Sequence, residues 1–249
     1  MKDPGLLVLP LLALVVIGFV WMIVALSLLL LGFPPFSPNS GFLYQELFVA
    51  YIATYFLSTY FMAAIVAASH SRLEDRRPTV ADGVRAANDH LLQIGAWSLL
   101  ASTVGVLARM GSLRSEGAGR FVVRLFGYSW PIASVFVLPA ILMEQLGPLR
   151  AFRRSQALLH QGWGSDQRGV LGTGVTFALF FLIGCVPFLW GLVGNDGLFV
   201  FVAVLFWLVL TVLWSAVHGI LVTTLYHYAT TSEASFGFRW QALNHPWVR

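Results

Sequence analysis

Long apolar runs separated by short polar segments dominate this sequence. The first run, roughly residues 6–31, contains no charged side chain. A helix needs about 20 apolar residues to cross a hydrocarbon core of about 30 Å. Hydrophobic residues make up 58% of the 249 residues and charged residues 10%, against about 45–50% and about 25% in soluble domains. This pattern predicts an integral membrane protein.

We predict an all-α, polytopic membrane bundle that forms one domain, with about six transmembrane helices. The first run follows Lys2 but is too long for the apolar region of a signal peptide, and no small-residue cleavage site follows it, so we expect it to be retained. Residues 194–197, Gly-Asn-Asp-Gly, predict a tight turn that pairs the last two spans as a hairpin. The predicted spans are roughly residues 6–31, 43–68, 91–109, 127–146, 170–193 and 198–227.

The Lys and Arg residues predict the orientation. If the N-terminus is cytoplasmic, most of these residues lie on the cytoplasmic side, as membrane proteins prefer. The loop after the third span is the exception, because it holds Arg120 and Arg124. Either this loop forms a short helix on the outer surface, or the third span does not fully cross; we favour a full crossing. We therefore expect an inner-membrane protein with both termini cytoplasmic, and the net charge of +4 needs no nucleic-acid partner.

Two segments, roughly residues 79–92 and 149–163, are predicted to be amphipathic helices in the membrane interface. In the first, Val80, Val84 and Leu91 share one helical face, and Arg85 lies elsewhere. Basic residues flank or join both segments and are candidates for contacts with anionic lipid headgroups, although they serve equally well as topology signals. They are Arg76, Arg77, Arg153 and Arg154.

Each amphipathic segment stands between two predicted spans, which indicates an internal repeat. Residues 84–93 weakly echo residues 151–160. Both units begin and end on the same sides of the membrane, so the predicted repeat is parallel.

Several short motifs lie along the second half of the chain: Trp130-Pro131, Phe136-Val137-Leu138-Pro139, Glu144, Gly147-Pro148, Ala151, Ser155, Trp163-Gly164, Leu225-Tyr226-His227-Tyr228-Ala229 and Phe236-Gly237-Phe238. These motifs resemble a family of prokaryotic membrane proteins known as a domain of unknown function. The resemblance covers roughly residues 42–240 and implies a membrane fold but no established reaction. There is a looser similarity to the membrane domain fused to some glycerophosphodiester phosphodiesterases, but we find no attached phosphodiesterase domain and do not expect that activity.

The sequence contains no recognisable catalytic motif. We find no zinc-binding His-Glu-x-x-His, no Gly-x-Ser-x-Gly elbow and no phosphate-binding glycine loop. The six His residues are scattered, and the lone Cys185 lies in an apolar run, where we expect a small buried side chain. We therefore predict a protein that is not an enzyme and has no metal or cofactor.

Polar groups within the predicted spans are the candidate functional residues. Glu46 and Glu144 lie near the ends of spans. They either reach the interface or accept hydrogen bonds from a neighbouring helix, or else they bind a cation or relay protons. His218 lies inside the last span, and we expect it to bond a carbonyl or a Thr hydroxyl of an adjacent helix. Tyr55 belongs to an aromatic stripe on one face of the second span, which either packs against helices or forms a groove for an acyl chain or a pigment-like ligand. The stripe comprises Tyr44, Phe48, Tyr51 and Tyr55, followed by Thr59 and Met62.

These observations favour a non-enzymatic membrane protein that organises lipids or partner proteins, in one version as an accessory subunit of a complex or as a homo-oligomer. The alternative is a small transporter or permease with a path between the two repeats. A path would need polar groups that converge at the midplane of the membrane, and the sequence offers few. They are Tyr55, Ser58, Thr59, Thr176 and His218.

Overall fold

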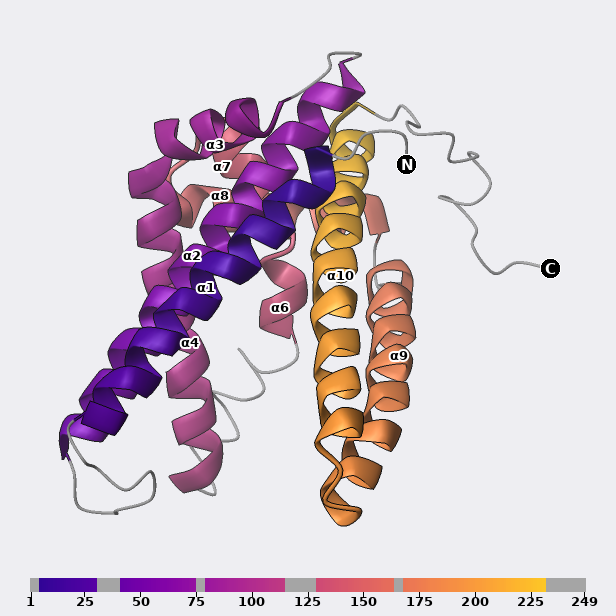
Figure 1. The fold of residues 1–249 in the computed structure, drawn as a ribbon. Coiled ribbons are helices and arrows are strands. Elements are labelled where there is room, and N and C mark those ends of the chain that lie inside the picture. Colours follow the sequence, from indigo (N-terminus) through magenta and orange to yellow (C-terminus); the bar gives the residue numbers. More distant parts are fainter. Residues whose placement is uncertain (1–4, 31–40, 75–78, 115–128, 164–167, 232–249) are drawn as a thin grey trace.

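The computed structural model describes residues 5–30, 41–74, 79–114, 129–163 and 168–231. All regular secondary structure within these ranges is helical, which confirms the predicted all-α class (Figure 1). The helices are α1 (Gly5–Leu30), α2 (Gly41–Leu73), α3 (Val80–Asp89), α4 (Leu91–Arg114), α6 (Ser129–Ala133), α7 (Val137–Met143), α8 (Pro148–Trp163), α9 (Arg168–Val193) and α10 (Gly197–Thr231).

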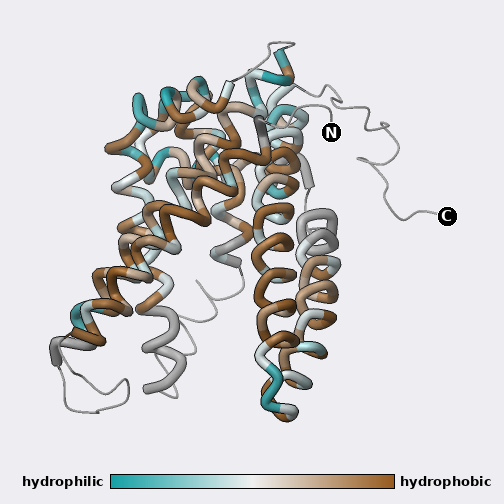
Figure 2. The backbone as a smooth tube through the Cα atoms, in the orientation of Figure 1, coloured by the Kyte–Doolittle hydropathy of each residue, from teal (hydrophilic) through white to brown (hydrophobic). Residues whose placement is uncertain are grey.

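Four helices within the described ranges are long and apolar enough to cross a membrane: α1, α2, α9 and α10. The chain is therefore a membrane protein. Figure 2 shows hydrophobic residues along these helices, whereas hydrophilic residues gather around α3 and at the turn between α9 and α10. In α4 the described side chains end at Val106, and the apolar segment within them, Leu91–Val106, is shorter than a full span. A total of six spans therefore remains a prediction.

The fourth predicted span, residues 127–146, is not one continuous helix. The helix is interrupted between α6 and α7, at residues 134–136. Pro139 lies in the first turn of α7. Backbone N–H groups in the first turn have no intrahelical acceptor, so the missing N–H group of proline costs no hydrogen bond there. In an unbroken helix its ring would clash with the carbonyl group of Val135, so the break falls one turn before the proline. The predicted span 127–146 would place this proline inside a helix, whereas the structure places it at the start of one.

The N-terminal half packs around α2, which contacts α1, α3, α4 and α10. Small side chains allow this close packing; Ala63 and Ala64 of α2, for example, are completely buried. Helix α3 lies against α2 at Gly83, where an added Cβ would lie 2.7 Å from the backbone oxygen of Ala64.

A capping box begins α3, because the Thr79 hydroxyl accepts a bond from the backbone N–H of Asp82 and the Asp82 carboxylate accepts one from the Thr79 N–H. The Thr79 N–H and hydroxyl groups both donate to the Asp82 carboxylate, and these two bonds lower the pKa of the Asp82 carboxyl group.

Helices α9 and α10 form the predicted hairpin, which is confirmed. Asn195 in their turn has a φ of 50°, a left-handed conformation that Asn adopts more readily than most residues. The indole of Trp207 packs over Gly184 and donates a 3.1 Å hydrogen bond to the Phe181 carbonyl oxygen across the pair.

Helix α10 also crosses α2. The crossing is tight at Gly219, which packs against Ile65, and the hydroxyl group of Thr223 lies 3.5 Å from the Val66 oxygen. Away from this point the two helices diverge, and α6 lies between them (Figure 1). This divergence creates space between the two halves of the chain.

Candidate functional site

The space between the diverging helices contains a cavity of about 550 Å³. Its walls come from α2, α4, the broken helix α6–α7 and α10. Cavities of this size are typical of small-molecule sites. The lining residues are Tyr55, Ser58, Thr59, Met62, Val66, Trp97, Ile132, Ser134, Val135, Leu138, Trp214, Ser215, His218 and Val222.

Four of the five polar residues that the sequence placed near the midplane converge on this cavity. Tyr55, Ser58 and Thr59 come from α2, and His218 comes from α10. The fifth, Thr176 on α9, does not line it. Sequence reasoning missed Ser134 and Ser215, because small hydroxyl residues are common in membrane helices and only the fold shows which of them face a cavity.

Several polar groups of the lining form no hydrogen bond with the described part of the chain. These are the hydroxyl groups of Tyr55, Ser58 and Ser215, and the Nδ1 atom of His218, which is buried. The Thr59 hydroxyl, in contrast, donates to the Tyr55 carbonyl oxygen of its own helix at 2.8 Å. Of these groups Nδ1 is a buried atom, and buried polar groups normally have partners, whereas Ser58 is exposed. The cavity wall therefore offers hydrogen-bonding capacity that the described protein does not use.

His218 does not make the bond that the sequence led us to expect. Its ring stacks on Trp214 of the same helix, with ring centroids 5.1 Å apart and an angle of 22° between the planes. No carbonyl or Thr hydroxyl group among the described residues bonds to Nδ1. The divergence of α2 from α10 removes the adjacent helix that would have supplied this partner.

The break between α6 and α7 is held by one side chain, the completely buried Ser155 of α8. Its hydroxyl group donates to the Ala133 carbonyl oxygen at 2.7 Å and accepts from the Phe136 N–H at 3.1 Å. One hydroxyl group therefore satisfies a backbone group on each side of the break. Non-helical backbone at membrane depth is tolerated only where such partners exist or where it borders a cavity, and both conditions hold here.

A charged cluster lies at the junction of α7, α8 and α10. The Glu144 carboxylate accepts bonds from Arg154 Nε at 2.9 and 3.1 Å and from the Tyr226 hydroxyl group at 2.6 Å. Gln145 follows with a φ of 52°, and this left-handed turn directs α8 back over α7. Hydrogen bonding to Glu144 raises the pKa of the Arg154 guanidinium group, which therefore stays charged.

This cluster is next to the cavity. Tyr226 contacts Phe136 edge to face, with ring centroids 5.8 Å apart, and Phe136 belongs to the break. Val222, one turn before Tyr226 on α10, lines the cavity itself. The cluster therefore joins α8 to α10 at one end of the cavity. The sequence identified Glu144 as a candidate but not its partner Tyr226, which is 82 positions away.

Glu46 lies between α1 and α2, away from the cavity and from the Glu144 cluster. Its carboxylate accepts a hydrogen bond from the Ser27 hydroxyl of α1, and its Oε2 atom is buried without a partner among the described residues. It lines a separate, mostly apolar groove of about 420 Å³ between α1 and α2. Glu46 and Glu144 therefore do not form one site.

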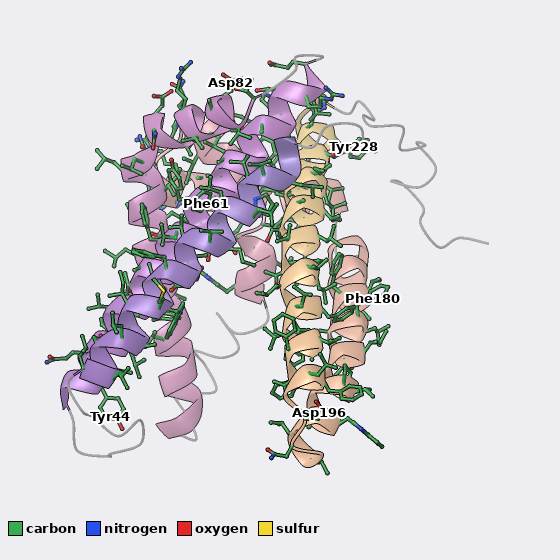
Figure 3. All side chains as sticks on the ribbon, in the orientation of Figure 1. Tyr44, Phe61, Asp82, Phe180, Asp196 and Tyr228 are labelled. Carbon is green, nitrogen blue, oxygen red and sulfur yellow. The ribbon has the colours of Figure 1, made fainter. Side chains whose placement is uncertain are left out.

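The aromatic stripe of α2 divides into two parts. Tyr44 and Phe48 are 62% and 54% exposed, and Figure 3 shows Tyr44 at the end of α2 remote from Asp82 of α3. Tyr55, followed by Thr59 and Met62, lines the cavity instead. The interior part of the stripe is thus a cavity wall, as the ligand-groove interpretation requires.

The two basic pairs behave differently. Arg76 and Arg77 lie outside the described residues. Arg153 is exposed on α8, whereas Arg154 is engaged by Glu144. A contact between these residues and anionic lipid remains a prediction, for which Arg153 is the more available of its pair.

Comparison with known proteins assigns the chain to a family. A model for a family of unknown function, DUF6159, matches residues 41–236. The chain belongs to DUF6159. The match includes every lining residue of the cavity as well as Ser155, Glu144 and Tyr226. The resemblance to an uncharacterised family is therefore confirmed, while a link between DUF6159 and glycerophosphodiester phosphodiesterases is not shown. No curated protein and no solved structure matches the chain.

Proposed function

We propose that this protein is a non-enzymatic membrane transporter that carries a small, uncharged molecule through the cavity. The observation that supports this most directly is the convergence of Tyr55, Ser58, Ser215 and His218, which have unused hydrogen-bonding capacity, on one cavity beside a broken helix. All of the described side chains that line the cavity are uncharged unless His218 is protonated. An ion would find no counter-charge among them, whereas a neutral polar molecule would have several hydrogen-bond partners.

The position of the cavity between the proposed repeat units supports transport. One unit is α2–α3–α4, and the other is the broken helix α6–α7 followed by α8 and α9, with a predicted amphipathic helix in the middle of each. The cavity takes its walls from the first unit, from the broken helix of the second and from α10. Transporters commonly bind substrate between repeats, at discontinuous helices whose backbone borders a cavity. Under this proposal the termini are cytoplasmic, in the inner membrane.

The sequence alone favoured the other hypothesis, an organiser of lipids or partner proteins. The argument against a transporter was that a path needs converging polar groups, of which the sequence offered few. The convergence of side chains from α2 and α10 on one cavity supports the transporter over the organiser.

Cysteine labelling tests this proposal without knowledge of the substrate. Cys185 is first replaced by Ala, and Ser215→Cys then places a thiol on the cavity wall. Val209→Cys is the matched control, because it lies on the same helix and is 53% exposed, but it is outside the cavity. Thiols react as thiolates, which form in water and not in lipid. We expect a charged, membrane-impermeant methanethiosulfonate to label Ser215→Cys at least about tenfold faster than Val209→Cys.

The side from which the label enters decides between functions. A transporter exposes its site alternately, so Ser215→Cys should react in both right-side-out and inside-out vesicles. Labelling from one side only would indicate a binding pocket and contradict transport. An absence of labelling from either side would contradict a water-accessible cavity.

A further inference from the structure

The arrangement of donors around the cavity indicates which molecules it accepts. We propose that it binds a flat, uncharged ring that carries a hydrogen-bond acceptor on each of two opposite edges, the chemistry of a quinone. This inference rests on the proposed function only because both use the same cavity. Binding of the ring does not require transport.

The first step concerns the proton on His218. A neutral imidazole ring carries one N–H group and one unprotonated nitrogen. Nδ1 is buried and has no partner among the described residues. An unpaired acceptor is tolerated more readily in a protein interior than an unpaired N–H group. The proton therefore belongs on Nε2, and His218 can act as a hydrogen-bond donor to a ligand.

The second step concerns the opposite wall. Tyr55 and Ser58 lie on α2, while Ser215 and His218 lie on α10, and these helices diverge from their crossing at Gly219 (Figure 1). Hydroxyl groups that can donate are therefore present on both walls. A ligand that accepts one hydrogen bond at each edge would engage α2 and α10 together.

The third step concerns the shape and polarity of the ligand. Trp97 of α4 and Trp214 of α10 are among the lining residues; Trp97 stacks on Trp130 and Phe152, and Trp214 stacks on His218. Aromatic rings prefer to contact other rings edge to face or offset. The remaining lining is aliphatic, for example Leu138 and Val222. A flat, apolar ring with carbonyl oxygen atoms on opposite edges satisfies the donors and the apolar walls at once, and a charged ring would have no counter-charge.

Binding is tested with menadione, a quinone without a long tail, added to the protein in lipid nanodiscs. The Cys185→Ala background is used because quinone rings add to thiols. Quinones quench tryptophan fluorescence, so the two cavity tryptophans report occupancy. We expect saturable quenching by menadione. Methylnaphthalene, the same ring system without oxygen atoms, and a sulfonated naphthoquinone should each compete with menadione at least about tenfold less well than an uncharged quinone does. Quenching that rises linearly with concentration, or equal competition by methylnaphthalene, would overturn the inference.

Variants locate the site. His218→Phe keeps a ring against Trp214 but removes its nitrogen atoms, and Ser58→Ala removes a donor from the opposite wall. We expect each to weaken menadione binding by about three- to tenfold, the contribution of one hydrogen bond. His227→Phe makes the same change on α10 away from the cavity and should leave binding unchanged. Equal affinity in all three variants would exclude this cavity as the quinone site.

The two experiments separate the two proposals. If the cavity is labelled from both sides but menadione does not bind saturably, only the ligand class is wrong. If menadione binds saturably but Ser215→Cys is not labelled, the quinone site stands and the transport proposal fails.

Discussion

Replacing Glu144 by Leu is expected to destabilise the protein by about 2–4 kcal/mol, the largest effect that we predict for a single side chain. The change removes the acceptor of both Arg154 and Tyr226. The Arg154 charge would then be partly buried without its partner, and the Tyr226 hydroxyl group, in a residue only 2% exposed, would lose its bond. Unfolding in mixed micelles, followed by tryptophan fluorescence, measures the loss.

A triple variant distinguishes this explanation from simple loss of packing. Glu144→Leu, Arg154→Met and Tyr226→Phe together leave no unpaired polar group. Apolar replacement of a complete buried ionic cluster is often close to neutral, so we expect the triple variant to lie within about 1 kcal/mol of the parent protein. If it is less stable than Glu144→Leu alone, the cost does not come from unpaired charge.

The Ser155→Ala variant should lose about 2–3 kcal/mol, because two backbone groups at the helix break lose their shared partner. The Ala133 carbonyl oxygen and the Phe136 N–H each bond to this hydroxyl group, and Phe136 is completely buried. We also expect faster hydrogen exchange at the Phe136 amide. Both quantities can be measured on the same detergent-solubilised sample.

Ser98→Ala is the matched control for this prediction. Ser98 is also buried, but its hydroxyl group bonds only to the Gly95 carbonyl oxygen of its own helix. Its removal leaves no backbone group without a partner, so the expected change is below about 0.5 kcal/mol. Equal losses in the two variants would show that Ser155 does not hold the break.

The long membrane-spanning helices could be predicted from sequence, because the length of an apolar run is a local property of the sequence. Helices α1 and α10 begin and end close to the predicted limits, and α8 begins at Pro148, next to the predicted start at residue 149. The break in residues 127–146 could not be predicted from the sequence. Pro139 permits either a kink within a helix or a new start, and the choice depends on Ser155, which lies on a different helix.

The candidate site was predictable in its parts but not as a site. The sequence identified Tyr55 and His218 as polar groups inside spans, since ionisable and hydroxyl groups stand out in apolar runs. It did not show that they share a cavity, because this depends on the angle between α2 and α10. That angle follows from the close contact of Gly219 with Ile65, a packing detail between residues far apart in the chain.

The central claim is that the space between α2 and α10 is a hydrated cavity and not a lipid-filled cleft. A nitroxide spin label at Ser215, compared with one at Val209, tests it directly through collisions with a polar nickel complex and with oxygen, which dissolves preferentially in lipid. The account predicts that the label at Ser215 collides mainly with the nickel complex and the label at Val209 mainly with oxygen. Oxygen-dominated collisions at both positions would contradict the claim.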